Sequence, residues 1–98
     1  MNKIYTFTSQ LWLYPGKAAW VFIILPMAIA QEISFLFEEK KRGWGSIKIS
    51  ATIGETTWDT SIFPDKRTGS YFLPVKQAVR KSEALREKED IEVTLEIK

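Results

Sequence analysis

The sequence predicts a mainly β fold with two short helices, arranged as one small closed β-barrel domain over residues 1–98. Two observations favour this class. Short stretches of the chain alternate apolar and polar residues, which is typical of half-buried strands. An apolar stretch also runs twice into a Leu-Pro pair, at Leu25-Pro26 and Leu73-Pro74, and then changes to helical spacing. A chain of this length holds one domain with a modest core.

The first two predicted strands form a hairpin near the N-terminus. Four apolar residues of one parity alternate with mostly polar residues, and they are Tyr5, Phe7, Leu11 and Leu13. Tyr14-Pro15-Gly16-Lys17 predicts a turn, because proline presets φ and glycine relaxes the next position. The aromatic and β-branched stretch from Trp20 to Leu25 then predicts a strand in the centre of a sheet.

The first helix is predicted to start at Pro26. The residue before a proline favours extended geometry, and proline itself suits the first position of a helix. The apolar residues of one helix face are Ile29, Ile33, Leu36 and Phe37. Lys40-Lys41-Arg42 would complement the helix dipole at the C-terminal end, with Gly43 as the left-handed cap. The alternative is that this basic triplet forms a binding patch.

Three further strands are predicted between the helices. Ile47 to Ile53 alternates apolar and polar residues, and Gly54-Glu55 predicts a two-residue hairpin loop with glycine first. Thr57 to Phe63 is the predicted return strand. A polar loop is predicted from Pro64 to Gly69, followed by a short strand from Tyr71 to Leu73.

The second helix is predicted to begin at Pro74, and a closing strand follows it. The inward residues of this helix would be Val75, Ala78, Val79 and Leu85. Ile91 to Ile97 alternates aliphatic and polar residues, which completes the order β-β-α-β-β-β-α-β. A sheet of this size protects its edges by curling into a barrel. The repeated strand-Leu-Pro-helix unit suggests two equivalent halves, each sending a helix across one end.

The composition excludes several kinds of chemistry. The chain has no cysteine and no histidine, so it lacks disulfides, thiolate nucleophiles and the commonest general base and metal ligand. We therefore expect no enzyme activity, no metal site and no cofactor, and we expect a cytoplasmic protein because a reducing compartment suits a chain without cysteine. The formal net charge of +2 is small for a dedicated nucleic-acid-binding protein.

The apolar stretch from Ala18 to Ala30 does not predict a membrane span. Its uncharged run of about 13 residues is shorter than the roughly 18 to 20 residues that a spanning helix needs. Lys17 bounds the run, and Pro26 divides it between two periodicities. We expect a buried strand that leads into a buried helix, and no association with a membrane.

The motifs of the second half resemble a known family. They are Gly45-Ser46-Ile47, Ala51-Thr52-Ile53-Gly54, Thr57-Trp58-Asp59-Thr60-Ser61-Ile62-Phe63-Pro64, Leu73-Pro74-Val75-Lys76 and Val79-Arg80-Lys81. With Trp20 and Leu25-Pro26 upstream, the likeness covers nearly the whole chain and is to the family of domain of unknown function 1905. The resemblance implies a small β-barrel of the double-split type and no established activity. Members can be fused to a domain linked to bacteriocin protection, which we expect this chain to lack.

Residues 71 to 97 also resemble, more distantly, the swapped-hairpin DNA-binding domains of the AbrB and MazE type. Those domains usually have glycine after the helix and Gly-Asp before the last strand, where this chain has Ala84 and Glu89-Asp90. Glycine adopts positive φ cheaply and glutamate does not, so the turn from Arg86 to Asp90 is expected to be longer or differently shaped. Those domains also act as dimers, whereas this chain holds both halves itself.

Basic side chains gather around the predicted second helix. They are Lys66, Arg67, Lys76, Arg80 and Lys81. Free backbone N–H groups at a helix start, together with nearby cations, can hold an anion or a phosphate, and Lys76 and Arg80 share one helix face. The alternative is that Arg80 pairs with Glu83 or Asp59 and that Lys76 is solvated.

A second candidate site is the strand that carries several hydroxyl groups. Its residues are Trp58, Asp59, Thr60 and Ser61. Asp59 could act as a base and Ser61 as a nucleophile, but neither has a histidine partner, and Lys76 would need a lowered pKa. Threonine also fits a β surface and pairs across strands without any chemistry. The four tryptophans could stack bases or line a pocket, but most are expected in the core.

Together these patterns predict a non-enzymatic binding or interaction module whose partner is a small ligand or a protein. One alternative is a nucleic-acid-binding protein that uses the five basic residues around the second helix. Another is a protein that binds a small anion at the start of that helix. We expect a monomer or a weak homodimer.

Overall fold

The computed structural model describes residues 3–14 and 20–98, so the predicted turn at residues 14 to 17 lies mostly outside the described residues. The elements are β1 (Ile4–Ser9), β2 (Leu11–Leu13), β3 (Val21–Ile24), α1 (Met27–Leu36), the short 3-10 helices η1 (Glu38–Lys40) and η2 (Gly43–Gly45), β4 (Ile47–Ile53), β5 (Thr56–Asp65), β6 (Ser70–Pro74), α2 (Gln77–Ser82) and β7 (Ile91–Ile97). The mainly β fold with two helices is confirmed. Within the described residues, no helix is both long and apolar enough to cross a membrane.

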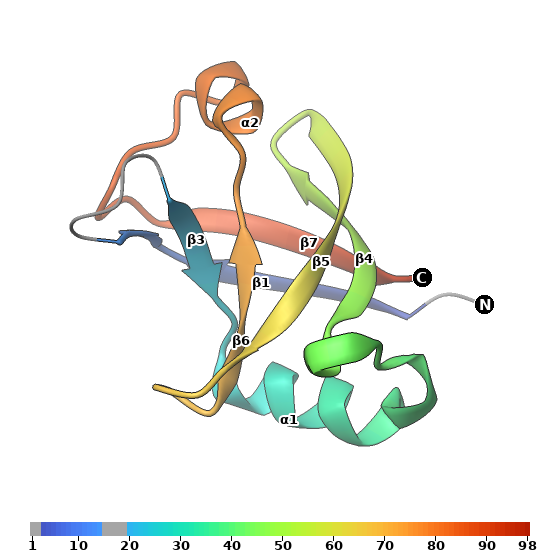
Figure 1. Cartoon of the computed structure of the whole chain (residues 1–98). Helices are drawn as coiled ribbons and strands as arrows, with labels where there is room; N and C mark the ends of the chain where they lie inside the picture. The colour runs from blue at the N-terminus through green and yellow to red at the C-terminus, as the bar shows by residue number, and fades with distance from the viewer. Residues whose placement is uncertain (1–2, 15–19) are drawn as a thin grey trace.

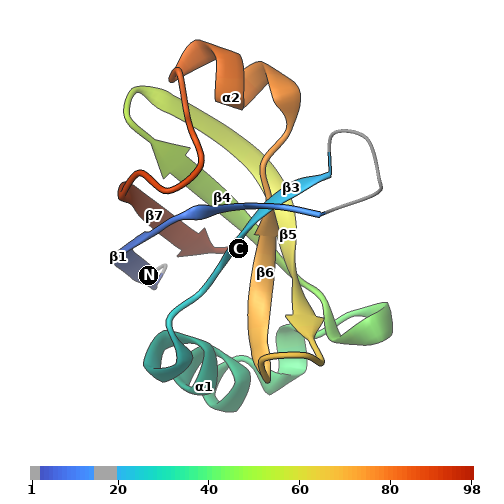
Figure 2. The ribbon, with the colours of Figure 1, turned by 90° about the vertical axis from the view of Figure 1, so that its left-hand side faces the viewer.

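The seven strands form one antiparallel sheet in the order β1-β7-β4-β5-β6-β3-β2. The sheet curves into a half-barrel, with α1 at one end and α2 at the other (Figure 1, Figure 2). The predicted closed barrel is wrong, because the described strands show no pairing between the two edges, β1 and β2. The double-split type stays a prediction.

The open sheet and the extra strand have one cause at Gln10. The predicted first strand is divided there: the part before Gln10 pairs with β7, and the part after it pairs with β3. The two edge strands are therefore joined by one residue of chain and not by a hydrogen-bond ladder. The Ser9 hydroxyl donates to the Ile24 carbonyl at 3.0 Å, which holds this joint against β3. The observed order is β-β-β-α-β-β-β-α-β.

The two Leu-Pro pairs lie at the ends of the neighbouring antiparallel strands β3 and β6, with Leu25-Pro26 directly after β3 and Leu73-Pro74 as the last residues of β6. Ile23 stands opposite Leu73 in this pairing, and both are fully buried. The amide of Leu25 donates to the Tyr71 carbonyl, and the amide of Val75 donates to the Val21 carbonyl, each at 3.0 Å. The two ends of the β3–β6 pairing thus carry equivalent hydrogen bonds. Because antiparallel strands end in opposite directions, the two helices leave at opposite ends of the half-barrel.

The first helix follows Pro26 as predicted but ends earlier. Its last residue is Leu36, and the amide of Phe37 closes it by donating to the Ile33 carbonyl. Gly43 does not cap this helix, because the backbone turns at Phe37 and η1 follows. The prediction that Lys40-Lys41-Arg42 complements a helix end is therefore wrong. Leu36 is 49 % exposed, so its predicted inward position is also wrong.

The second helix begins three residues later than predicted. Pro74 is the last residue of β6, and Lys76 precedes the helix in an extended conformation. The hydrogen bond from Val75 to β3 keeps this stretch in the sheet, which delays the helix. Val79 is buried as expected, whereas Ala78 is exposed. After the helix, Ala84 and Lys88 adopt positive φ values of 52° and 68°, so the turn forms without glycine.

The interior is built by the alternating strands. The inward residues of β4 and β7 are all buried, as predicted, and they are Ile47, Ile49, Ala51, Ile53, Ile91, Val93, Leu95 and Ile97. The register places Ile49 opposite Ile97 and Ala51 opposite Leu95, so the same parity faces the core on both strands. Helix α1 adds Ala30 and Ile33 at its end of this core.

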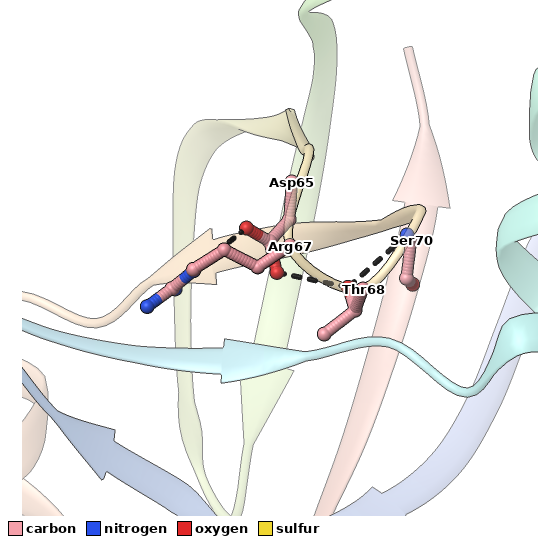
Figure 3. Close-up of polar contacts among 4 residues, drawn as sticks. All are labelled: Asp65, Arg67, Thr68 and Ser70. Atoms are coloured by element: carbon pink, nitrogen blue, oxygen red, sulfur yellow. Dashed lines mark hydrogen bonds and ion pairs between the residues drawn. The ribbon is translucent and has the colours of Figure 1, made fainter.

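The loop after β5 is held by a buried carboxylate. Asp65 is 7 % exposed and accepts hydrogen bonds from Thr68 Oγ1 at 2.8 Å and Arg67 Nε at 3.2 Å (Figure 3). Ser70, the first residue of β6, donates a hydrogen bond from its hydroxyl to the Leu25 carbonyl at 2.7 Å. Burial alone would raise the pKa of Asp65, but the hydrogen bonds from Thr68 and Arg67 outweigh it and lower the pKa. This loop therefore ties β6 to the first Leu-Pro pair.

We predict that Asp65→Asn lowers the free energy of unfolding at pH 7 by about 1–3 kcal/mol, because a buried charged acceptor is lost. The folded pKa is depressed, so the stabilisation exists above the unfolded pKa of about 3.9 and disappears as the pH falls through the folded value. Urea denaturation between pH 7 and strongly acidic pH should show the two proteins converging. Asp59→Asn, at a carboxylate 76 % exposed, is the control, and equal stability of Asp65→Asn and wild type at pH 7 would contradict the prediction.

The predicted Gly54-Glu55 hairpin loop is confirmed, and it also anchors α2. Ile53 pairs with Thr56 across the loop, and Gly54 has a φ of 59°. The Glu83 carboxylate accepts hydrogen bonds from Thr56 Oγ1 at 2.6 Å and the Glu55 amide at 3.3 Å. A Cβ on Gly54 would overlap that carboxylate.

We predict that Gly54→Ala lowers the free energy of unfolding by about 1–2 kcal/mol through left-handed strain. The displaced Glu83 contacts would add to this loss. Gly43→Ala is a matched control, since no atom lies within 4 Å of the added Cβ, and it should stay within about 0.5 kcal/mol of wild type. Urea denaturation of both variants measures the difference, and equal effects would refute the explanation.

Candidate functional site

The structure divides the predicted basic site. Lys66 and Arg67 lie in the turn after β5, whereas Lys76, Arg80 and Lys81 lie at or in α2. Strand β6 separates the two groups, so they occupy opposite ends of the half-barrel (Figure 1). The five residues therefore do not form one continuous basic surface.

The two arginines of that set already have intramolecular partners. Arg67 bonds to Asp65 and lies over the Phe22 ring, 5.6 Å from its centroid. Arg80 donates through Nε to the Val75 carbonyl at 3.2 Å. At the predicted anion site, Lys76 therefore lies just before the second helix, and the Arg80 side chain is bonded to the Val75 carbonyl.

The hydroxyl-rich strand does line a hollow in the surface. This first hollow has a volume of about 520 Å³ and lies against the outer face of β4 and β5. Its lining residues are Lys48, Ile49, Asp59, Thr60, Ser61, Phe63 and Lys98. Asp59 pairs with Lys98, with Nζ and Oδ1 3.5 Å apart. Of the predicted residues, the structure thus brings together Asp59, Thr60 and Ser61.

Two further hollows adjoin the first. A hollow of about 190 Å³ is lined partly by Trp20, Trp58 and Lys76, and it shares Asp59 and Thr60 with the first hollow. A third, of about 490 Å³, shares Lys48 and Lys98 with the first hollow. Its other lining residues are Glu39, Lys40, Lys41 and Arg42. We call these three neighbouring hollows, which share lining residues, the basic trough.

The basic trough collects positive charge from separate parts of the chain. Among the described residues that line it, the cations are Lys40, Lys41, Arg42, Lys48, Lys76 and Lys98, and the acids are Glu39 and Asp59. The Lys98 amide donates to the Lys48 carbonyl at 3.1 Å, so these two residues are neighbours. The Lys40 ammonium donates to the Lys98 carbonyl at 2.6 Å. The Lys41 ammonium donates to the Glu38 carboxylate at 2.8 Å, and this hydrogen bond raises the pKa of Lys41.

Sequence reasoning missed the trough because its cations come together through strand pairing. The outward parity of Lys48 is visible in the alternation of β4, and Lys98 follows the alternation of β7. The pairing of these two strands, which are far apart in sequence, was not predicted. The sequence places the basic triplet from Lys40 to Arg42 at a helix end, whereas in the structure it lines this surface.

A row of aromatic rings crosses the outer face of the neighbouring strands. The rings of Tyr14, Trp20, Phe22, Phe72 and Phe63 follow one another with centroid distances of 4.9–5.7 Å. Two of them, Trp20 and Phe63, also line the basic trough. The expectation that most tryptophans lie in the core is wrong, because Trp12, Trp20 and Trp44 are 57 %, 37 % and 95 % exposed. Trp58 is buried in the core cluster.

The carboxylates of the described residues do not gather in metal-binding groups of three or more. The candidate site is thus a surface of lysines, hydroxyls and aromatic rings. Such a surface can bind negative charge and stack flat rings.

Comparison with known proteins identifies a family. The model of a family described as "Domain of unknown function (DUF1905)" matches residues 7–95, which is the family that the sequence motifs resemble. No curated protein matches the chain.

Proposed function

Since the chain belongs to the DUF1905 family, for which no function is given, we propose from the site itself that this protein is a non-enzymatic binding module. Its ligand is an anion held in the basic trough. This proposal keeps the predicted anionic ligand but moves the site from the start of α2 to the outer face of β4 and β5. The trough offers a larger group of cations than α2 does.

The observation that carries the proposal is the sharing of Lys48 and Lys98 between the two larger hollows. On one side of this lysine pair lies Ser61, which stands opposite Lys48 on the outer face of the sheet. On the other side lies the triplet from Lys40 to Arg42. Lysine ammonium groups attract a phosphate as point charges, and a hydroxyl adds a hydrogen bond by rotating its proton toward the anion. An anion at the lysine pair is therefore reached by donors from both sides.

The same geometry supports a binding role over catalysis. Asp59 is engaged with Lys98 and its side chain is 76 % exposed, so it is not held against Ser61 as a general base. A serine nucleophile needs such a base, and the chain has no histidine to supply it. Turnover of a substrate that is abolished by Asp59→Asn or Ser61→Ala would refute this part of the proposal.

We also propose a cytoplasmic location and a monomeric or weakly dimeric state. A chain without cysteine suits a reducing compartment. The two Leu-Pro units on β3 and β6 support a relation to barrels of the double-split type, in which each half of the chain contributes one such unit.

We predict that tripolyphosphate binds the protein and that Lys48→Ala/Lys98→Ala weakens this binding about tenfold, since each cation contributes up to about 1 kcal/mol at an exposed site. Isothermal titration calorimetry at low salt measures the dissociation constant. The control is Lys81→Ala/Arg86→Ala, which removes the same charge from residues that do not line the trough. Failure of tripolyphosphate to bind, or an equal loss in both double variants, would reject the proposed function.

A further inference from the structure

The basic trough is elongated, and its length sets a requirement on the ligand. It begins at Trp20 and Lys76 near α2, follows β5 past Asp59 and Thr60, and ends at the triplet from Lys40 to Arg42. Strand β5 runs from the α2 end to the α1 end of the half-barrel (Figure 1, Figure 2). Its residues 58–63 alone span roughly 17 Å at about 3.3 Å per residue. A small anion fills one part of such a site, whereas an extended polyanion can follow all of it.

Aromatic rings lie along the same path. Trp20 lines the trough at the α2 end, and Phe63 lines it at the middle hollow. Both rings contact Phe72, with centroid distances of 5.5 Å and 5.4 Å, so they belong to one packed row. Trp20 is 37 % exposed and thus offers part of its ring to a ligand. Cations and rings therefore line the same surface, as in sites that bind phosphates and bases together.

We propose that the ligand of the basic trough is a single-stranded nucleic acid. Its phosphates follow the lysines from Lys76 to Lys40, and its bases stack on Trp20 and against Phe63. This inference rests on the proposed function, which it deepens by naming the ligand class.

The dimensions favour a single strand over a duplex. The hollow beside Trp20 and Trp58 has a volume of about 190 Å³, which is room for about six water molecules at ~30 Å³ each. One flat base fits such a space, and a base pair inside a duplex cannot enter it without leaving its stack. An acidic peptide would satisfy the lysines but would leave the aromatic rings without stacking partners.

The charge of the trough sets the expected salt dependence. Its described lining residues carry six cations and two acids, which leaves charge for about four phosphates. Each phosphate contact of a single strand contributes about −0.7 to the slope of log K against log salt, so the expected slope is about −3. An acidic or neutral surface would show no such slope.

The test is fluorescence anisotropy with a labelled oligothymidylate of about twelve nucleotides at about 50 mM salt. Lys76→Glu and Trp20→Ala should each weaken binding by about 5- to 100-fold, because one phosphate or one stacked base is lost. Both should weaken tripolyphosphate binding less than they weaken oligonucleotide binding, because tripolyphosphate is held at Lys48 and Lys98. The control is Trp44→Ala, at an indole that is 95 % exposed and does not line the trough, and its affinity should match wild type.

The outcomes separate this inference from the proposed function. The inference is overturned if the oligonucleotide binds no more tightly than tripolyphosphate, if Lys76→Glu has no effect, or if duplex DNA or oligoglutamate of equal charge binds as tightly. In each of these cases tripolyphosphate binding still supports the proposed function. Because Trp20 also packs against Phe22 and Phe72, near-UV circular dichroism checks the fold of Trp20→Ala. If that variant unfolds, Lys76→Glu and the salt slope decide the question.

Discussion

The antiparallel pairing of β3 with β6 is the constraint on which the rest of the structure depends. Proline has no amide hydrogen, so Pro26 and Pro74 cannot extend a ladder as donors. The donors at the two ends of the pairing are Leu25, just before Pro26, and Val75, just after Pro74, and they bond to the carbonyls of Tyr71 and Val21 at 3.0 Å each. This pairing fixes where both strands end and in which directions the chain leaves. The positions of the two helices and of the flanking strands β2 and β5 follow from it.

The basic trough depends on this strand arrangement, but its clustered positive charges also destabilise the fold. Six cations along one surface repel one another, and the protein offsets part of that cost locally. Lys98 is paired with Asp59, and Lys41 bonds to Glu38 at 2.8 Å and to the Ser34 hydroxyl at 2.9 Å. Lys40 bonds to a backbone carbonyl. These contacts are solvent-exposed or partly so, hence a polyanion can exchange with them at little cost.

Much of the fold could be predicted from the sequence, because strand alternation is a local signal. The bounds of β4 and β7 match the predicted strands, since burial of one face imposes a period of two along each of them. The division of the first strand at Gln10 could not be predicted, because the alternation continues across the change of partner. The late start of α2 arises from the bond between Val75 and Val21, which belongs to the pairing of distant segments. The residues near Pro74 alone therefore could not predict this hydrogen bond.

The candidate site was harder to predict than the core. Asp59, Thr60 and Ser61 were identified from their side chains, and they do line the first hollow. Lys48 and Lys98 were missed because each is an ordinary outward residue of its own strand. Only the pairing of β4 with β7 makes them neighbours. The end of α1 at Leu36 then frees the basic triplet to join them.

The one-residue joint at Gln10 has a mechanical consequence. Sliding β1 along β7 by one residue would pull β2 along β3 by the same amount, and it would turn the core side chains of both strands outward. The two edges of the sheet therefore hold each other in place through a single peptide segment. Fraying at one edge should be transmitted to the other, so the half-barrel is expected to open as one cooperative unit.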